Sequence, residues 1–307
     1  MNILIFGSNG LVGKSLNKIL SKVSEYNIIS STREETDLFN FKQTSEKISK
    51  VKPDVIINCA AKVGGIYAND TKRTQFLIEN LKINLNILES SMPFNEIKII
   101  NLGSSCIYPL NAENPIKEDS FMDGKLEPTN SPYAMAKLTS IELGRSISSE
   151  YGHKIVNLMP TNLYGPNDNF DEEYSHVIPG LISRMHEAKK INAKEFGIWG
   201  SGMPLREFLY VDDLSNCINF IIQNKIESDL LNVGSGVEIS ILDLAKKIKT
   251  LVGFDGELNF DNTKPDGNPR KLLDSTYINN LGWEASTNLD DGLKKTYRWF
   301  KENIALN

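Results

Sequence analysis

The sequence predicts an α/β protein with a doubly wound parallel sheet and a smaller, mixed α/β carboxy-terminal domain. Three observations lead to this fold class. Short apolar runs of strand length alternate with helical stretches through the first half of the chain. These runs are apolar at consecutive positions, as in strands that helices cover on both faces. After Gly165-Pro166 the alternation weakens into an acidic, aromatic loop and a segment rich in glycine and proline.

The amino-terminal half supplies the expected strands and the first helix. Residues 2–6 are apolar and end at Gly7, and a periodic run over residues 11–20 follows, which predicts a strand, a tight turn and a helix. Further β-branched runs extend the pattern. A strand is therefore expected at each of residues 27–30, 55–58, 97–102 and 155–158.

Helix start signals place the longer helices. Ser131 and Pro132 predict the start of a helix that runs to about residue 150, because serine can cap free amide groups and proline is favoured at the first helical position. Ser240, followed by Asp243 and an apolar-periodic run to residue 251, predicts a capped helix. Two further helices are expected over residues 177–190 and 289–303.

Composition and charge exclude several classes of protein. With 307 residues, 40% hydrophobic and 24% charged, the chain can bury a globular core in one or two domains. The net charge of −5 disfavours nucleic-acid binding, which needs a basic face to neutralise phosphates. The start of the chain, MNILIFGSNG, lacks the features of a signal peptide, and no apolar stretch reaches membrane-spanning length. Neither nucleic acid nor membrane is therefore an expected partner.

The cysteines and histidines suggest neither a disulfide framework nor a metal site. The three cysteines are far apart, at positions 59, 106 and 217, and no Cys-x-x-Cys spacing occurs. The three histidines, at positions 153, 176 and 186, show no ligand cluster. A reducing cytoplasm is the expected location, and no bound metal is expected.

A glycine-rich turn follows the first predicted strand and opens the first predicted helix. Its pattern is Gly-x-x-Gly-x-x-Gly, and in this context the glycines let a pyrophosphate approach backbone amides at the helix amino terminus. Such a turn can be purely structural, but the strand before it and a candidate catalytic tyrosine downstream favour a dinucleotide site. The residues expected to hold the cofactor are Gly7, Asn9, Gly10, Leu11, Val12 and Gly13.

Arg33 favours NADP(H) over NAD(H). An acidic residue at the end of the second strand would hydrogen-bond a ribose hydroxyl, but the sequence there is Ser-Ser-Thr-Arg, over residues 30–33. A guanidinium suits the 2′-phosphate of NADP instead. The alternative is a solvated arginine close to Glu34 and Glu35.

Tyr133 and Lys137 are one helical turn apart and therefore share one face of the predicted helix. The neighbouring ammonium is expected to lower the pKa of the phenol, so that the phenol can transfer a proton near neutral pH. Ser104 follows the strand at 97–102, at the end where open parallel sheets bind ligands, and its hydroxyl can orient a substrate oxygen. Ser105 is the alternative for this role.

Ser104, Tyr133 and Lys137 resemble the catalytic triad of the short-chain dehydrogenase/reductase superfamily, extended branch. Longer runs resemble the GDP-L-fucose synthase family: LGSSCIYP (102–109), EPTNSPYAMAK (127–137), SHVIP (175–179), WGSGMPLREFLYVDDL (199–214) and KPDGNPRKLLD (264–274). The resemblance implies a Rossmann-like NADP-binding domain over residues 1–165 and about 205–235. It also implies a substrate-binding domain over 166–204 and 236–307, and a homodimer.

The resemblance further implies a bifunctional reaction. Members of the family epimerise GDP-4-keto-6-deoxy-D-mannose at carbons 3 and 5 and then reduce the 4-ketone with NADPH, which gives GDP-L-fucose. In that scheme Tyr133 transfers the proton, Lys137 also holds the nicotinamide ribose, and Ser104 orients the reacting oxygen. Inversion at carbon needs one group that removes a proton and another that returns it on the opposite face. Cys106 and His176 match the base and the acid of the family.

Other matches to the family concern the GDP-sugar. They imply cations on the diphosphate and an aromatic surface near guanine or ribose. The matching positions are Asn162, Val177, Arg184, Trp199, Arg206 and Lys271. The chain departs from the family at Asn9, where an arginine often assists Arg33, so the preference for NADP is expected to be weaker unless Lys14 compensates.

Purely structural roles for Cys106 and His176, and other functions for the chain, stay open. A lone cysteine is usually a small buried hydrophobe, and His176 could cap a helix or belong to the core. A relative that reduces the 4-keto group of another GDP-sugar, such as a GDP-heptose, would retain Cys106 and His176 but use them little. A catalytically silent nucleotide-binding scaffold could share the fold, since fold alone does not establish chemistry. The intact triad argues against that scaffold.

Overall fold

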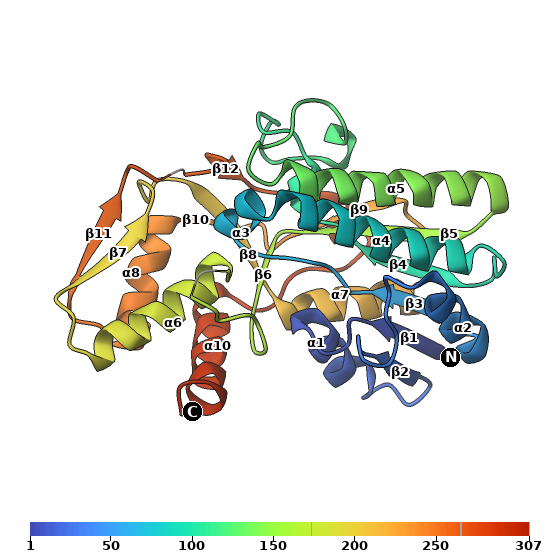
Figure 1. Cartoon of the computed structure of the whole chain (residues 1–307), viewed down its shortest axis with the longest axis horizontal. Coiled ribbons are helices and arrows are strands. Elements are labelled where there is room, and N and C mark those ends of the chain that lie inside the picture. The colour runs from blue at the N-terminus through green and yellow to red at the C-terminus, as the bar shows by residue number, and fades with distance from the viewer. Residues whose placement is uncertain (173, 265, 307) are drawn as a thin grey trace.

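Six parallel strands form the central sheet, in the order β2-β1-β3-β4-β5-β9. The computed structural model describes residues 1–172, 174–264 and 266–306. Positions 173 and 265, within the predicted substrate-binding domain, and position 307 at its end lie outside the described residues. The strands are β1 Asn2–Phe6, β2 Asn27–Ser31, β3 Val55–Asn58, β4 Lys98–Leu102, β5 Lys154–Pro160 and β9 Leu230–Val233 (Figure 1).

The strand order confirms the predicted doubly wound α/β class. From β1 the chain moves to β2 on one side and then to β3 on the other, so the winding direction reverses between β1 and β3. In open parallel sheets, ligands bind outside the carboxyl ends of the strands at such a reversal. The first five strands match their predicted ranges to within two residues, whereas β9 was not predicted.

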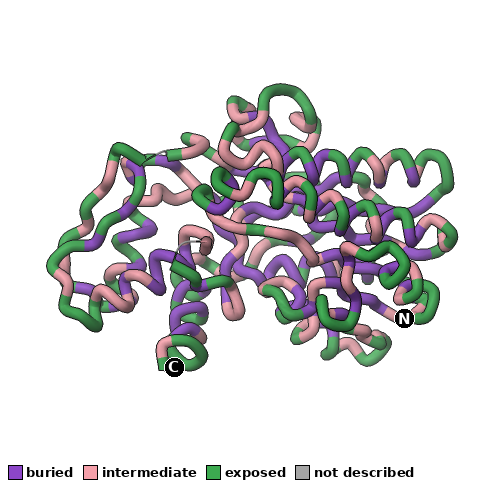
Figure 2. The backbone as a smooth tube through the Cα atoms, viewed as in Figure 1, coloured by how far each residue is buried: buried purple, intermediate pink, exposed green. Residues whose placement is uncertain are grey.

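Helices cover both faces of the sheet, and the side chains of β1 show how. Ile3 and Ile5 pack in one core with helices α1 and α7, while Leu4 and Phe6 pack in another with α2, α4 and α5. Each such fully buried side chain contributes about 1.5–3 kcal/mol relative to exposure. Figure 2 shows the central strands as mainly buried. The helices are α1 Leu11–Leu20, α2 Phe41–Val51, α3 Ile66–Thr71, α4 Arg73–Ser91, α5 Ser131–Tyr151 and α7 Val211–Gln223.

The capping predictions have mixed outcomes. Ser240 caps helix α8 as predicted, because its hydroxyl accepts a hydrogen bond from the amide of Asp243 at 3.0 Å. The predicted cap of α5 is wrong: Asn130 is the N-cap residue, without a side-chain capping bond, and Ser131 is already helical. The Ser131 hydroxyl instead accepts a hydrogen bond from Arg73 of α4, at 3.2 Å. The proline at the start of α5 is found as predicted.

The second half builds smaller sheets against a core of its own. Strand β8 pairs with β6, β10 and β12, and β7 pairs with β11. Helices α6, α8 and α10 pack against these strands around a second apolar cluster. The strands are β6 Asn162–Tyr164, β7 Glu195–Trp199, β8 Leu205–Tyr210, β10 Glu238–Ser240, β11 Glu257–Asp261 and β12 Arg270–Lys271. The helices are α6 Val177–Lys190, α8 Ile241–Val252, α9 Thr276–Asn280 and α10 Leu289–Asn303.

The segment 205–235, predicted to return to the first domain, is shared between the two halves. Strand β8 pairs only within the smaller sheet, whereas α7 packs beside α1 and β9 is the edge strand of the large sheet. The division at residues 165, 205 and 235 stays a proposal. Within the parts of the chain that the structure describes, every helix is too short or too polar to cross a membrane.

A buried glutamate on β8 fixes the strands that lead to the site. The Glu207 carboxylate accepts hydrogen bonds from the amides of Gly236, at 2.8 Å, and Leu273, at 3.1 Å. Burial raises the pKa of Glu207, and these backbone donors oppose the rise. Each hydrogen bond to a charged group contributes roughly 1.5–3 kcal/mol. The neighbouring strand residues Arg206 and Lys271 are thereby held in register.

Candidate active site and cofactor crevice

A cavity of about 320 Å³ lies at the carboxyl ends of β1, β2 and β3, where the winding reverses. Four of the residues predicted to hold a cofactor line this cavity: Gly7, Asn9, Gly10 and Arg33. The predicted residues 11–13 do not line it and form the first turn of α1. The loop after β2 adds Phe39, a residue that belongs to no motif of the sequence analysis.

Two glycines of the turn are required by close packing. Gly7 has a φ of +76°, and a Cβ there would lie 2.7 Å from the amide nitrogen of Ala60. A Cβ on Gly13 would lie 2.4 Å from the carbonyl oxygen of Gly7. Gly10 is the N-cap of α1 and brings no side chain to its amino terminus. Backbone amides at this end can therefore meet a diphosphate, so the turn fits a dinucleotide.

Arg33 packs over an aromatic ring and interacts electrostatically with the neighbouring Glu34 carboxylate. Its guanidinium carbon lies 5.0 Å from the centre of the Phe39 ring. The Glu35 carboxylate accepts from the amide of Thr32 at 2.9 Å. Lys14 does not line the cavity, and its ammonium donates to the side chain of Asn167 at 3.2 Å. Arg33 thus faces a space that can hold a phosphate, and Lys14 is directed elsewhere.

Ser104, Tyr133 and Lys137 come together at the carboxyl end of β4. Tyr133 is 9% exposed, and the Ser104 side chain lies close enough to the phenol to act on its pKa. The Lys137 ammonium lies 5.9 Å from the centre of the Tyr133 ring and donates to the carbonyl oxygen of Leu102 at 2.6 Å. The alternative, Ser105, is buried in the first turn after the strand.

The predicted effect of Lys137 on Tyr133 is wrong for this structure. Burial raises the pKa of Tyr133, the negative charge of Cys106 adds to the rise, and the hydrogen bond from Ser104 opposes it. Burial also lowers the pKa of Lys137 to about 8, against the influence of Cys59 and Cys106. The loss of hydration therefore decides the direction of the Tyr133 pKa. The phenol is held in its protonated form, which suits a proton donor.

Cys106 lies two residues beyond Ser104, in the short 3₁₀ turn Ser105–Ile107. The Ser104 hydroxyl accepts from the Cys106 amide at 3.2 Å and fixes the turn. The sulfur accepts from the Lys271 ammonium at 3.6 Å and from the side-chain amide of Asn130 at 3.7 Å. Cys106 also packs against the apolar cluster that contains Tyr133. The thiol is therefore not an isolated core residue.

His176 is the N-cap residue of α6, but its side chain makes no capping hydrogen bond. Burial lowers the pKa of the imidazole. The preceding segment packs against the turn before α3, since the amide of Gly65 donates to the carbonyl of Tyr174 at 3.3 Å. Tyr174 in turn packs against the cluster that contains Tyr133 and Cys106. The structure thus brings the chain beside His176 to the catalytic cluster.

The cationic residues predicted to bind the substrate fall into two groups. Arg206 and Lys271 are register partners on β8 and β12, and Arg206 donates to the carbonyl of Asp266 at 3.1 Å. Arg184, on α6, donates to the carbonyl of Gly197 at 3.4 Å. Burial lowers the pKa of both arginines. The Lys271 ammonium also contacts the Cys106 sulfur, to which it donates at 3.6 Å.

The remaining predicted substrate residues have different surroundings. Trp199 is half exposed, and its ring meets the Tyr67 ring edge to face at 6.1 Å. The Asn162 amide donates to the carbonyl of Glu207 at 2.8 Å. Val177 is the first residue of α6 and packs against the second core. Trp199 alone of these three offers an open surface.

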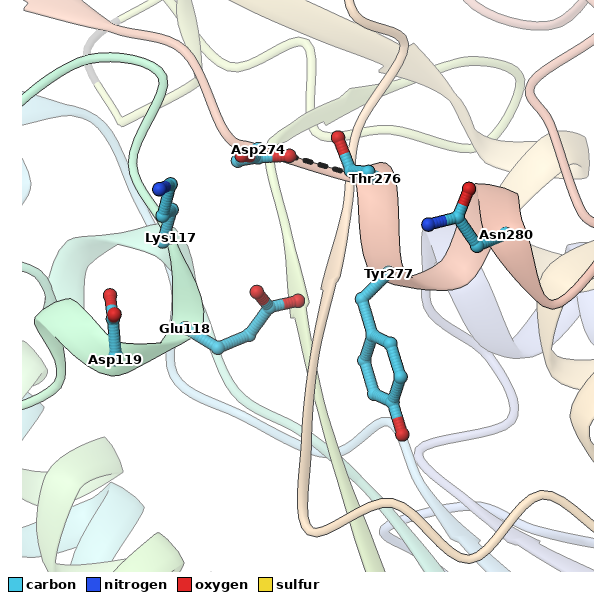
Figure 3. A pocket seen from close by; sticks show the side chains of 7 residues that line it. All are labelled: Lys117, Glu118, Asp119, Asp274, Thr276, Tyr277 and Asn280. Atoms are coloured by element: carbon cyan, nitrogen blue, oxygen red, sulfur yellow. Dashed lines mark hydrogen bonds between the residues drawn. The ribbon is translucent and has the colours of Figure 1, made fainter.

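A second depression of about 410 Å³ lies between the 3₁₀ turn Glu118–Ser120 and α9. Its lining, shown in Figure 3, consists of Lys117, Glu118, Asp119, Asp274, Thr276, Tyr277 and Asn280. None of the predicted site residues is among them. Its carboxylates serve the fold: Glu118 accepts from the amide of Asn232, and Asp274 accepts from that of Thr276. Among the described residues, no set of three or more potential metal ligands comes together.

Comparisons with known proteins agree with this geometry. The model of the NAD dependent epimerase/dehydratase family matches residues 3–234. The probable GDP-L-fucose synthase 1 of Oryza sativa subsp. japonica is 43% identical, over 98% of this chain and 92% of that protein. A GDP-6-OMe-4-keto-L-xylo-heptose reductase from C. jejuni superposes with a TM-score of 0.92, at 31% identity, over 98% of this chain and 97% of that one. A GDP-L-fucose synthetase from Naegleria fowleri bound to NADP superposes with a TM-score of 0.89. It is 29% identical in sequence, and the match covers 99% of this chain and 95% of that one.

Proposed function

The chain belongs to the NAD dependent epimerase/dehydratase family and, within it, to the GDP-L-fucose synthases, and we propose that it makes GDP-L-fucose. Its substrate is GDP-4-keto-6-deoxy-D-mannose, which it epimerises at carbons 3 and 5 and then reduces at carbon 4. One observation carries the proposal. The thiol of Cys106, suited to proton removal from carbon, shares one apolar cluster with the phenol of Tyr133, suited to proton delivery to oxygen.

The proposed cofactor is NADP(H), which supplies the hydride for the reduction when bound. The turn of Gly7, Gly10 and Gly13 would hold its diphosphate, and Arg33 its 2′-phosphate. Two features of the chain support this fit: a Cβ at Gly7 or Gly13 would clash with backbone, and Arg33 lines the adjoining cavity. The similarity to the Naegleria fowleri protein bound to NADP also supports it.

Arg33→Ala is expected to weaken NADPH binding and to spare NADH binding. A charged hydrogen bond contributes roughly 1.5–3 kcal/mol, so the dissociation constant for NADPH should rise about ten- to a hundredfold. Fluorescence titration of both cofactors measures the effect. Lys42→Ala, an exposed lysine on α2 outside the cavity, is the matched control. An equal change for NADH and NADPH, or no change for either, would contradict the assignment.

Five residues have proposed roles in the reaction. Tyr133 delivers a proton to the oxygen at carbon 4, Ser104 orients that oxygen, and Lys137 holds the nicotinamide ribose. Cys106 removes protons from carbons 3 and 5, and His176 returns them on the opposite face. Burial makes a protonated imidazole a readier donor, since it lowers the pKa of His176. A raised pKa keeps Tyr133 protonated until the oxygen gains negative charge.

For the nucleotide half of the substrate we propose Arg184 and Arg206 as ligands of the diphosphate. Half-buried guanidinium groups on a chain of net charge −5 provide a local site for an anion. Trp199 provides an aromatic surface for guanine or ribose, since its side chain is half exposed and the Lys264 ammonium lies 5.3 Å from its ring centre. Asn162, Val177 and Lys271 complete the proposed substrate contacts.

The proposed assembly is a homodimer formed through α4 and α5. These helices lie side by side (Figure 1), and they expose apolar side chains at Ile78, Leu85 and Met135, which are 45%, 40% and 49% exposed. Exposed apolar groups on adjoining helices favour association with a second copy. A cytoplasmic location is proposed as well, because the mechanism needs Cys106 as a free thiol.

Leu85→Asp is expected to convert the dimer into a monomer, because a carboxylate buried in an apolar interface lacks hydration and a partner. Light scattering after size-exclusion chromatography measures the mass. Ile191→Asp is the matched control, since Ile191 is 75% exposed at the end of α6. A monomeric wild-type protein, or an unchanged dimer in Leu85→Asp, would contradict this interface.

Product analysis tests the function itself. After incubation with NADPH and GDP-4-keto-6-deoxy-D-mannose, NMR should show a sugar inverted at carbons 3 and 5 and reduced at carbon 4. Reduction without inversion would favour a 4-keto reductase of another GDP-sugar, a reading that the similarity to the C. jejuni heptose reductase supports. No loss of NADPH absorbance with any GDP-keto sugar would favour a silent scaffold.

A further inference from the structure

Tyr67, on α3, joins the part of the chain with the large sheet to the part with the smaller sheets. Its ring centre lies 6.1 Å from that of Trp199, with the two planes at 78°, and 6.2 Å from that of Tyr174. The edge-to-face arrangement with Trp199 is favourable for an aromatic pair at this separation. Tyr67 is 38% exposed and Trp199 50%, so their contact lies at the surface and not in a core. Tyr67 has no role in the mechanism proposed above.

Helix α3 has an anchor at each end. The Asn69 side-chain amide donates to the two carbonyls of the turn 64–65, at 2.7 and 3.0 Å, and fixes the start of the helix. At the other end, the ammonium of Lys72 lies 3.6 Å from the centre of the Tyr174 ring. The helix that carries Tyr67 is therefore fixed by contacts other than those of Tyr67 itself.

The backbone around Trp199 is fixed, but the indole ring needs a contact from the side. Strand β7 pairs with β11 in a two-stranded sheet, and the chain turns at Gly200, whose φ is +84°. The Ser201 amide donates to the Asp266 carboxylate at 2.7 Å and holds this turn. These bonds act on the backbone, and burial does not confine a ring that is half exposed. Tyr67 supplies an aromatic contact that can set the plane of the indole.

Helix α3 also borders a second residue proposed for the nucleotide. A Cβ on Gly267 would lie 3.3 Å from the Cδ1 of Ile66 and 3.6 Å from the Nη2 of Arg206, so Gly267 is close to both. The proposed ligands of the base and of the diphosphate, Trp199 and Arg206, therefore both adjoin α3. An aromatic surface beside a guanidinium suits a nucleoside diphosphate.

We propose that Tyr67 is a positioning residue for the nucleotide part of the substrate. Its ring holds the Trp199 indole in the orientation in which the indole meets guanine or ribose. The large-sheet part of the chain thereby helps to shape a binding site whose proposed ligands belong to the other part. The inference rests on the proposed GDP-sugar function, and it adds a residue that acts through Trp199 and not on the reacting atoms.

Titration with GDP measures this role. Tyr67→Ala should raise the dissociation constant for GDP roughly three- to tenfold, the contribution of one aromatic pair. It should leave NADPH binding unchanged, because Tyr67 does not line the cofactor cavity. Tyr67→Phe keeps the ring and should bind GDP as the wild type does. Tyr277→Ala removes a tyrosine that is 48% exposed on α9, and it is the matched control.

The kinetic constants should divide in the same way. A contact with the nucleotide is present both before and during the reaction, so Tyr67→Ala should raise KM for the keto sugar and leave kcat unchanged. Tyr67→Leu keeps an apolar side chain without a ring, should behave as Tyr67→Ala, and decides the case if that variant does not fold. Unchanged GDP affinity in these two variants, or an equal loss in Tyr67→Phe, would overturn the proposal.

A double-mutant cycle shows whether Tyr67 acts through Trp199. In a Trp199→Ala background, Tyr67→Ala should cause no further loss of GDP affinity, because the ring that Tyr67 holds is absent. Losses that multiply would overturn the proposal, since Tyr67 would then act on the nucleotide by another route.

Fluorine NMR of protein that contains fluorotryptophan separates this inference from the proposed function. The chain has three tryptophans, at positions 199, 283 and 299, and Trp199→Phe identifies the signal of the first. Tyr67→Ala should shift that signal in the free protein and leave the other two in place. GDP binding by the wild type together with an unmoved Trp199 signal would overturn this inference alone. A shifted signal in a protein that binds no GDP would refute the proposed function, and the role in nucleotide binding with it.

Discussion

Tyr133→Phe should slow NADPH oxidation about 10³-fold, within the range that a positioned proton donor contributes to catalysis. In the proposed mechanism, the Tyr133 hydroxyl delivers the proton to the oxygen at carbon 4. The phenylalanine ring can keep the edge-to-face contact with Phe76, whose centre lies 6.2 Å from that of Tyr133. Loss of absorbance by NADPH, with the keto sugar at saturation, measures the rate.

The same variant should leave proton exchange at carbon measurable, because Cys106 and His176 are unchanged. Tyr151→Phe, a half-exposed tyrosine at the end of α5, is the matched control and should behave as the wild type. If Tyr133→Phe lost both steps to the same extent, the phenol would have a role in epimerisation. If it reduced the ketone at the wild-type rate, Tyr133 would not be the proton donor.

Cys106→Ser should slow deuterium exchange at carbon by roughly 10²–10⁴-fold, the contribution of a general base. A serine hydroxyl in the same place holds its proton too strongly to act as the base. NADPH binding should stay as in the wild type, since the cavity that contains Arg33 does not include Cys106. NMR of the keto sugar in deuterated solvent measures exchange, and fluorescence titration measures binding.

Cys217→Ala is the control for cysteine loss in general. Cys217 is buried in the core between the large sheet and α7 and has no proposed role in the reaction. The Cys217→Ala variant should catalyse deuterium exchange at carbon at the wild-type rate. Undiminished exchange in Cys106→Ser would remove the thiol from the mechanism, and weaker NADPH binding would show that the substitution disturbs more than the base.

The first half of the fold could be predicted because its signals are local. The apolar run at residues 2–6, the turn at Gly7 and the periodic helix at 11–20 each depend on neighbours in sequence, and all three are found. The smaller sheets could not be predicted in this way. Their strands are two to six residues long and pair over long separations, as Lys271 does with Arg206, so no periodic pattern identifies them.

The site was predictable in its residue types and less so in its contacts. The spacing of Tyr133 and Lys137 places them on one helix face, yet the direction of the Tyr133 pKa depends on burial, which the spacing does not reveal. The bond between Lys271 and Cys106 joins residues 165 positions apart. Asn130 carries no motif of its own, and only the folded loop shows that its amide faces the sulfur.

Proton exchange in deuterated water, without NADPH, separates epimerisation from reduction. In the proposed mechanism, Cys106 removes protons from the carbons next to the ketone in the same site where Tyr133 delivers a proton for the reduction. The wild type and Tyr133→Phe should both incorporate deuterium at carbons 3 and 5 of GDP-4-keto-6-deoxy-D-mannose, and Cys106→Ser should incorporate little. An absence of deuterium in the wild type, or equal incorporation in Cys106→Ser, would contradict the account.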